Sequence, residues 1–311
     1  MRRLLAESAR KAIGRSSVTA IRAAEFFLHR RPTRRLEVGS HSDELDRTGV
    51  CVAAPEHLEI LWKDETVIFP LYESSLAHSL WRAQEFSLFM QHKMELRRPL
   101  LDFGCGDGSF AAVLFDEIEY GMDIDEQALE LAAQFKIYGK LIKPEGLSIP
   151  LADGAVRSVF SNSVLEHVKN LDPFVREIGR VLTDGGTFMF TVPVAQFAKD
   201  LELYFGKAES RQVNADYFHR NLLESERWQE VLARNGLQVL SIRAYQPAWF
   251  TFYYMMLRFF GNRILGRIIP NIRRKVWQRY GRRMIEMVRK SISDGTASGG
   301  NIFIVAKKTG G

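Results

Sequence analysis

Leu100-Leu-Asp-Phe-Gly-Cys-Gly-Asp-Gly-Ser-Phe110 is the stretch that decides the fold. The apolar run Leu100–Phe103 predicts a short buried strand, three glycines follow at alternate positions, and a helical pattern runs from Phe110 to Ile118. Glycines let the backbone turn sharply and approach a ligand, and a helix N-terminus offers free N–H groups. This unit indicates the nucleotide-binding start of a doubly wound α/β sheet. The dinucleotide fingerprint Gly-x-Gly-x-x-Gly is not met, because Ser109 stands at the third glycine's place.

The bulk composition excludes several classes of protein. A chain of 311 residues is long enough to bury a sizeable core. Its two cysteines, Cys51 and Cys105, are too few for a zinc cluster or a disulfide framework, which fits a reducing, cytoplasmic location. No apolar run in the sequence approaches the ~20 residues that a membrane-spanning helix needs.

Charge is spread unevenly along the chain, whose net charge is +6. Residues 1–35 carry ten Lys or Arg against two Glu, and residues 248–290 carry eleven against one, so the remainder is acidic. Two basic segments on an acidic body predict a negatively charged partner surface, either a membrane or a nucleic acid. Three interpretations of residues 1–35 stay open: an ordinary basic surface helix, a helix on a membrane surface, and a mitochondrial transit peptide.

Further motifs follow the glycine turn at definite spacings. They are Asp123, which lies 21 residues beyond Asp102, Glu145-Gly146 before Ile149-Pro150, Asn162-Ser-Val-Leu-Glu-His-Val168, and Arg180-Val-Leu-Thr-Asp-Gly-Gly186. Together with the glycine turn, this set resembles the class I S-adenosylmethionine (SAM)-dependent methyltransferases of type 11. The resemblance implies an enzyme of the EC 2.1.1 type, with SAM as its cofactor. It also implies a doubly wound, seven-stranded Rossmann-like α/β sheet.

The resemblance further implies which residues hold SAM. Backbone contacts would come from Gly104, Cys105 and Gly106, and Asp102 would reach the amino group of SAM. Asp123 would accept hydrogen bonds from both ribose hydroxyls, as an acidic residue does at the same place in dinucleotide folds. The other expected members of this cofactor site are Ile124, Glu145, Gly146 and Asn162. In related enzymes a helix before the first strand covers the cofactor. The residues of the corresponding helix here therefore have two open interpretations: they line the cofactor pocket, or they only pack in the core. These residues are Trp81, Arg82, Glu85 and Phe86.

Two histidines are the candidates for catalysis. Methyl transfer is an in-line displacement, so positioning supplies most of the catalysis and a base is needed only for a hydroxyl or a protonated amine. His167 is the first candidate base and His219 the second, although a histidine that simply packs would look the same. Leu165-Glu166-His167 is similar to a segment of ubiquinone-biosynthesis O-methyltransferases, where an upstream Glu joins the pair in metal binding. Ser163 stands at that place, so we predict no metal.

An insertion separates the last two predicted strands, Leu237–Ala244 and Asn301–Lys307. The family joins these strands through a short connection, whereas more than fifty residues intervene here. Residues 249–290 begin with the aromatic run Trp249–Leu257 and continue as a basic amphipathic pattern, which suits a membrane interface. Three alternatives stay open: the core of a helical subdomain, a dimer face, and basic residues that follow RNA phosphates. We do not expect a nucleic-acid substrate, because no Asn/Asp-Pro-Pro-aromatic motif follows the fourth strand.

The predicted organisation has four parts. Residues 1–74 form a basic N-terminal extension and linker, 75–246 the SAM-binding core, 247–299 the basic aromatic helical insertion, and 300–311 the last strand and tail. The predicted function is O-methylation of a small or lipid-linked amphipathic substrate by a cytoplasmic protein peripheral to the membrane. The alternatives are methylation of a soluble metabolite and a non-catalytic scaffold with a methyltransferase-like fold. The sequence carries no signal for the oligomeric state.

Overall fold

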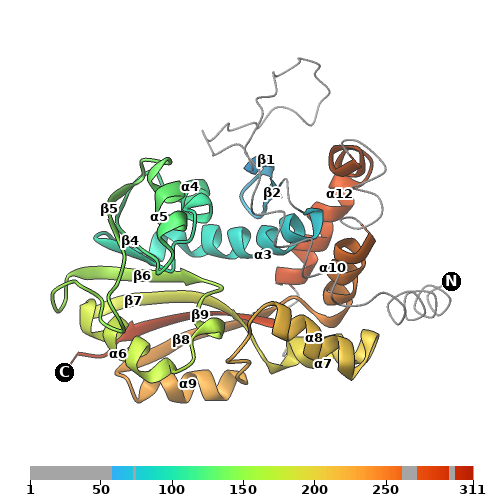
Figure 1. Cartoon of the computed structure of the whole chain (residues 1–311). Coiled ribbons are helices and arrows are strands. Elements are labelled where there is room, and N and C mark those ends of the chain that lie inside the picture. Colours follow the sequence, from blue (N-terminus) through green and yellow to red (C-terminus); the bar gives the residue numbers. More distant parts are fainter. Residues whose placement is uncertain (1–57, 73–74, 261–271, 294–297, 311) are drawn as a thin grey trace.

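The computed structural model describes residues 58–72, 75–260, 272–293 and 298–310 (Figure 1). The predictions made for residues 1–35 lie outside the described residues. The strands are β1 (Leu58–Lys63), β2 (Ile68–Tyr72), β3 (Leu100–Phe103), β4 (Ile118–Met122), β5 (Tyr138–Ile142), β6 (Val156–Asn162), β7 (Leu182–Pro193), β8 (Leu237–Tyr245) and β9 (Asn301–Lys308). The helices are α3 (Leu76–His92), α4 (Ser109–Leu114), α5 (Glu126–Ala133), α6 (Leu171–Val181), α7 (Ala195–Phe205), α8 (Lys207–Asp216), α9 (Ser225–Ala233), α10 (Ala248–Phe260) and α12 (Ile272–Ser293), with short 3-10 turns at Lys93–Glu95 and Leu165–His167.

A seven-stranded sheet forms the centre of the molecule, in the order β5-β4-β3-β6-β7-β9-β8. All neighbours are parallel except β9, which runs antiparallel to both β7 and β8. The chain moves outward from β3 to β5 and then returns to place β6 on the other side of β3. Such a reversal opens a crevice at the carboxyl ends of the strands, where ligands bind in doubly wound sheets. The predicted fold class is confirmed.

Helices cover both faces of this sheet (Figure 1). On one face α6 and α9 pack through Val175, Ile178 and Trp228 against the buried side chains of the central strands. On the other face α3 and α4 form a second core, in which Phe89 contacts the rings of Phe160 on β6 and Phe303 on β9 at centroid distances of 5.8 and 5.2 Å. Burial on both faces explains why the central strands read as apolar runs without alternation.

The hairpin of β1 and β2 is not predicted from the sequence, because residues 1–74 are assigned to an extension and linker. The two strands pair antiparallel, and Val67, Ile68 and Phe69 are buried. The ring of Phe69 lies 4.6 Å from that of Trp277 on α12. The hairpin therefore lies within the segment predicted as extension and linker, yet its strands pack against helices of the main body.

Between β8 and β9 the structure describes two helices, α10 and α12. They pack against α3 and the hairpin through a shared cluster that includes Phe250, Ile285 and Val288. Arg274 of α12 pairs with Glu59 of β1 at 2.7 Å, and Arg289 pairs with Asp64 in the hairpin turn. Among the described helices, none is both long and apolar enough to cross a bilayer.

Candidate active site

The glycine turn after β3 is fixed by its backbone. The N–H groups of Gly104 and Cys105 donate to the carbonyl oxygen of Met122 at the end of β4, at 2.8 and 2.9 Å. Gly104 has φ +77°, and a Cβ there would stand 2.5 Å from a methyl group of Val164. Gly106 has φ +54°, but a Cβ there would meet no atom within 4 Å. The turn is therefore closed on the side of Gly104 and open at Gly106.

Asp123 links this turn to the end of β4. Its Oδ2 accepts from the Gly106 N–H at 2.8 Å, and its Oδ1 accepts from the Asp125 N–H at 2.9 Å. Asp125 caps α5 by accepting from the N–H of Gln127 at 2.9 Å. Ile124 is 77% exposed, so an apolar side chain stands in the open beside the Asp123 carboxylate. The spacing predicted from the sequence thus brings Asp123 to the glycine turn.

Asp102 lies within β3, one residue before its end, and is 4% exposed. Its carboxylate accepts a hydrogen bond from the hydroxyl of Tyr138 at 2.7 Å. Burial raises the pKa of Asp102 to about 7, and the nearby Asp123 carboxylate adds to this effect. No sequence pattern predicts Tyr138 as the partner of Asp102. Its ring covers Gly121, where a Cβ would stand 2.7 Å from the ring.

The remaining residues expected at the cofactor differ in their surroundings. Glu145 and Gly146 are exposed in the loop that follows β5. Gly146 has φ +76°, and a Cβ there would meet nothing within 4 Å. Cys105 is buried in the turn, and burial strongly raises the pKa of its thiol, which therefore stays protonated at neutral pH.

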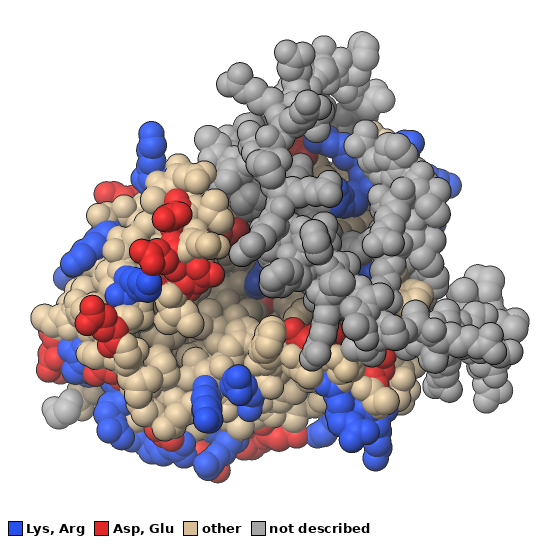
Figure 2. Space-filling model, in the orientation of Figure 1, with Lys and Arg blue, Asp and Glu red and all other residues tan. Residues whose placement is uncertain are grey.

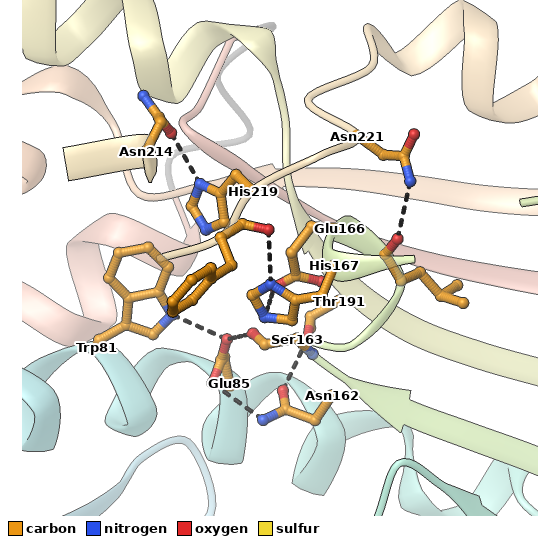
Figure 3. Close-up of polar contacts among 12 residues, drawn as sticks. Trp81, Glu85, Asn162, Ser163, Glu166, His167, Thr191, Asn214, His219 and Asn221 are labelled. Atoms are coloured by element: carbon orange, nitrogen blue, oxygen red, sulfur yellow. Dashed lines mark hydrogen bonds and ion pairs between the residues drawn. The ribbon is translucent and has the colours of Figure 1, made fainter. Parts of the chain in front are cut away.

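Glu85 of α3 is the centre of a buried hydrogen-bond network at the carboxyl end of β6 (Figure 3). Its Oε1 accepts from the indole Nε1 of Trp81 at 2.9 Å and from Oγ of Ser163 at 2.7 Å. Its Oε2 accepts from Arg82 at 2.5 Å and from Nδ2 of Asn162 at 3.2 Å. The network ties α3 to the two residues that end β6 and begin the next loop.

These two residues are held from the opposite side by β7. The Oδ1 of Asn162 accepts from the Thr191 hydroxyl at 2.7 Å, and the Ser163 N–H donates to the Thr191 carbonyl at 3.1 Å. Ser163 has φ +54°, a left-handed conformation that is rare outside glycine and is found at functional sites when the surroundings enforce it. Phe86, in contrast, is fully buried and stacks on Phe110 at 4.4 Å, so it packs in the core.

The two predicted histidines lie together, with ring centroids 5.8 Å apart. Nδ1 of His167 lies 3.4 Å from the Phe218 carbonyl oxygen, and Nδ1 of His219 lies 2.8 Å from Oδ1 of Asn214. Because both partners accept, each Nδ1 carries the proton and each Nε2 keeps its lone pair. Burial lowers the pKa of His167, and burial together with His167 lowers that of His219 to about 4. Both rings are therefore neutral at pH 7.

Glu166 is the site residue that sequence reasoning missed, although it stands in the quoted Leu-Glu-His segment. It is 2% exposed, its Oε1 lies 3.7 Å from Nε2 of His167, and its Oε2 has no hydrogen-bond partner in the described structure. Burial raises the pKa of Glu166 to about 8, and the carboxylate of Glu85 adds to the shift. A buried oxygen without a partner is costly, so it marks a place that a ligand can satisfy.

Aromatic rings from three segments border this cluster. Trp81 contacts Phe197 of α7 and Tyr254 of α10 at centroid distances of 5.4 and 4.9 Å. Tyr217 stacks on His219 at 5.5 Å and shares a hydrogen bond with the Tyr254 hydroxyl. The face seen in Figure 2 is hollowed near its centre, where Figure 1 places the carboxyl end of β6. The insertion thus contributes one wall of the site.

Residues 101–190 match the family model described as a methyltransferase domain. This part of the chain is a methyltransferase domain of the class I SAM-dependent type. The matched segment begins at β3 and ends within β7, so it contains the glycine turn, Asp123 and the Glu166–His167 pair. SAM is the methyl donor of this family.

The curated relatives are also methyltransferases. A malonyl-[acyl-carrier protein] O-methyltransferase of Legionella pneumophila is 31% identical over 118 residues, which are 36% of this chain and 42% of that protein. A probable S-adenosylmethionine-dependent methyltransferase of Mycolicibacterium smegmatis is 27% identical over 144 residues, which are 46% and 52% of the two chains. The chain spans about half the length of the curated relatives it matches.

A solved structure shows the same fold. The geranyl diphosphate C-methyltransferase of Streptomyces coelicolor superposes with a TM-score of 0.50 over 85% of this chain and 88% of that one, at 18% identity. At this identity the likeness concerns the architecture of the methyltransferase alone. Within the described residues, no three His, Cys, Asp or Glu side chains form a group able to hold a metal ion.

Proposed function

We propose that this methyltransferase transfers the methyl group of SAM to a hydroxyl of a small or lipid-linked amphipathic acceptor, with His167 as the general base. The observation that carries the proposal is the cluster of Glu166, His167 and His219 at the carboxyl end of β6. It lies beside an aromatic wall and at the same edge of the sheet as the glycine turn. When bound, SAM supplies an electrophilic methyl group on a sulfonium.

The residues at the strand ends fit SAM. Asp123 retains acceptor capacity for the two ribose hydroxyls, since each carboxylate oxygen can accept more than one hydrogen bond. The open space at Gly106 leaves room for the cofactor against the turn, and the exposed Ile124 offers an apolar face to the adenine ring. A carboxyl group that burial keeps partly protonated, as at Asp102, gains from the approach of an ammonium group. Cys105, Glu145, Gly146 and Asn162 complete the proposed cofactor site.

On the acceptor side, the protonation states of His167 and Glu166 suit a hydroxyl as the group that is methylated. Nε2 of His167 has a lone pair and accepts the hydroxyl proton, while the protonated Glu166 donates to the same oxygen through its unpartnered atom. His167 would hold the proton that the hydroxyl loses, and SAM, when bound, would supply the methyl group and be left as its neutral demethylated thioether. His219 has the lower basicity of the two rings and serves better as a contact to the acceptor.

Two features support an amphipathic acceptor met at a membrane. The rings of Trp81, Tyr217 and Tyr254 offer an apolar wall beside the polar cluster. The basic segments 1–35 and 249–290 are suited to anionic lipid, so we propose a cytoplasmic protein that binds the membrane peripherally. A soluble acceptor remains the second outcome of the test below.

The test uses the full chain with methyl-labelled SAM and two acceptor pools, a bacterial polar-lipid extract and a mixture of hydroxylated soluble metabolites. His167→Asn should lower methyl transfer by about 10²–10⁴-fold, while calorimetry shows SAM affinity within twofold of the wild type. The matched control is His92→Asn, at the end of α3 and remote from the cluster. Undiminished methyl transfer by His167→Asn would refute its role as the general base. Label found in the soluble pool alone would refute a lipid-linked acceptor.

A further inference from the structure

The helix α12 is amphipathic, and its apolar face is already occupied. Met284, Ile285 and Val288 are buried in the cluster shared with α3 and the hairpin, and Ile292 is buried against the second core. Ser291 accepts from Nε2 of Gln84 on α3 at 2.7 Å. This side of α12 is therefore held firmly against the body of the protein, and the opposite side is what it offers to solvent.

The opposite side is a stripe of unneutralised positive charge. Five exposed basic residues recur at helical spacing along it: Lys275, Arg279, Arg282, Arg283 and Lys290. None of the five pairs with a carboxylate among the described residues. Glu286, the acidic residue within the stripe, is bonded by Arg289 at 2.6 Å. Figure 2 shows blue side chains at the upper right, where Figure 1 places α12.

Tyrosines stand exposed on the same pair of helices. Tyr280 of α12 is 44% exposed and Tyr253 of α10 is 46% exposed, and Lys290 lies 5.9 Å from the ring of Trp249. Aromatic rings of this kind sit at the headgroup level of a bilayer, beside cations that meet anionic lipid. The aromatic run of α10 is divided, because Phe250 and Tyr254 point inward and are buried.

The two helices connect this stripe to the acceptor site. Tyr254 and Arg258 of α10 both contact Tyr217, which stacks on His219. The guanidinium of Arg258 lies 4.5 Å from the Tyr217 ring. The insertion therefore has one surface in the acceptor site, on α10, and another facing solvent, on α12.

We propose that the outer face of α12 is a docking surface for anionic lipid headgroups, and that docking there brings the acceptor site to the bilayer. Only the second part of this proposal, that docking brings the acceptor site to the bilayer, rests on the proposed function, because lipid binding needs no methyl transfer. A single stripe on one helix face, flanked by tyrosines, matches a planar array of phosphates. Each cation near such a surface strengthens binding by about fivefold.

The test is sedimentation of the full chain with vesicles of phosphatidylcholine, with and without phosphatidylglycerol. One variant replaces four cations of the stripe with glutamine: Lys275, Arg279, Arg282 and Arg283. The matched control removes the same charge from exposed positions elsewhere: Lys140, Arg157, Lys169 and Arg211. The stripe variant should lose at least about 100-fold in partitioning to anionic vesicles, and the control should stay within threefold. Equal losses in the two variants would overturn the proposal.

Residues 1–35 are basic in every variant and could bind the vesicles themselves. A second measurement therefore tests whether α12 itself contacts the vesicle. An environment-sensitive dye on Arg282→Cys should shift to the blue on addition of anionic vesicles, while the same dye on Arg211→Cys should not. A 20-nucleotide RNA is titrated in parallel, and RNA binding that depends on the stripe without vesicle binding would assign the surface to nucleic acid instead. Calorimetric SAM affinity should be equal in all variants. A methyl-transfer failure with intact vesicle binding would refute the proposed function and leave the docking surface standing.

Discussion

Replacing Asp102 with asparagine should stabilise the ligand-free protein and weaken its hold on SAM. Asp102 is buried inside β3 and accepts from the Tyr138 hydroxyl at 2.7 Å. Burial and the Asp123 carboxylate raise the pKa of Asp102 to about 7, so ionising it in the folded protein is costly. Asparagine has the same shape and still accepts from Tyr138 through its amide oxygen, but it carries no charge.

The size of the effect follows from the two pKa values. A carboxyl whose folded-state pKa is raised binds more protons when folded, so its contribution to the free energy of unfolding falls as pH rises between 3.8 and about 7. Each pH unit in that window costs about 1.4 kcal/mol, so Asp102 should destabilise the wild type by about 2–3 kcal/mol between pH 5 and pH 7. Asp102→Asn removes this loss. The pKa of Glu166 is raised to about 8 in both proteins, so its contribution cancels in the difference.

The assay is urea unfolding of wild type and Asp102→Asn at pH 5 and pH 7 without ligand, followed by calorimetric titration with SAM at pH 8. The advantage of the variant should grow by about 2–3 kcal/mol between the two pH values, while its SAM affinity falls at least about tenfold. Asp116→Asn, at an exposed position after α4, is the control that should change neither. Parallel pH dependence in wild type and Asp102→Asn would refute the raised pKa, and equal affinity would refute the contact with the amino group.

Three further predictions concern the same edge of the sheet. The kcat/KM for methyl transfer should fall in acid, as His167 gains a proton at a pH below the ordinary histidine pKa, and again above about pH 8, as Glu166 loses one. Glu166→Gln should abolish the alkaline limb, and a flat profile in initial-rate assays would exclude both roles. Asp123→Ala should weaken SAM binding by at least about 100-fold, because it removes the ribose partner and the acceptor for the Gly106 N–H. Calorimetry should place the affinity of Asp123→Asn between those of wild type and Asp123→Ala, and unchanged affinity would refute the assignment of the SAM pocket. Arg180→Gln should lower the free energy of unfolding by about 2–4 kcal/mol, because Arg180 donates to two loop carbonyls and two carboxylates. The free energy is measured by urea unfolding, with Arg176→Gln at an exposed position as the control. A decrease no larger than that of the control would contradict the prediction.

The sheet could be predicted because its signals are local. Short apolar runs, the glycine turn after Leu100–Phe103 and the capping Asp125 each lie within a few residues of the structure they specify. The hairpin had no such signal. Ile68–Tyr72 is buried throughout and contains Pro70, so it neither alternates nor reads as a strand. Its burial comes from α3, which begins four residues after the hairpin ends, and from α12, which begins 200 residues after it.

The site divides in the same way. Asp123 and the glycine turn could be predicted from family spacing, whereas the partner of Ser163 is Glu85, 78 residues away. Ser163 stands in the sequence where similar enzymes have a carboxylate, yet α3 brings the carboxylate of Glu85 to its hydroxyl at 2.7 Å. The unpartnered oxygen of Glu166 is likewise a property of the packed structure, since burial by distant segments creates it.

The helix α3 has a consequence for how this protein can be recombined with its relatives. The hairpin precedes the SAM-binding core in the chain and α12 follows most of it, yet both pack on α3. Phe69 of the hairpin contacts Trp277 of α12, and Gln84 of α3 donates to Ser291 of α12. Grafting α10 and α12 onto another methyltransferase would therefore expose their apolar faces unless α3 and the hairpin travelled with them. These elements depend on one another for the burial of their apolar faces, although they lie in two separate segments of the sequence.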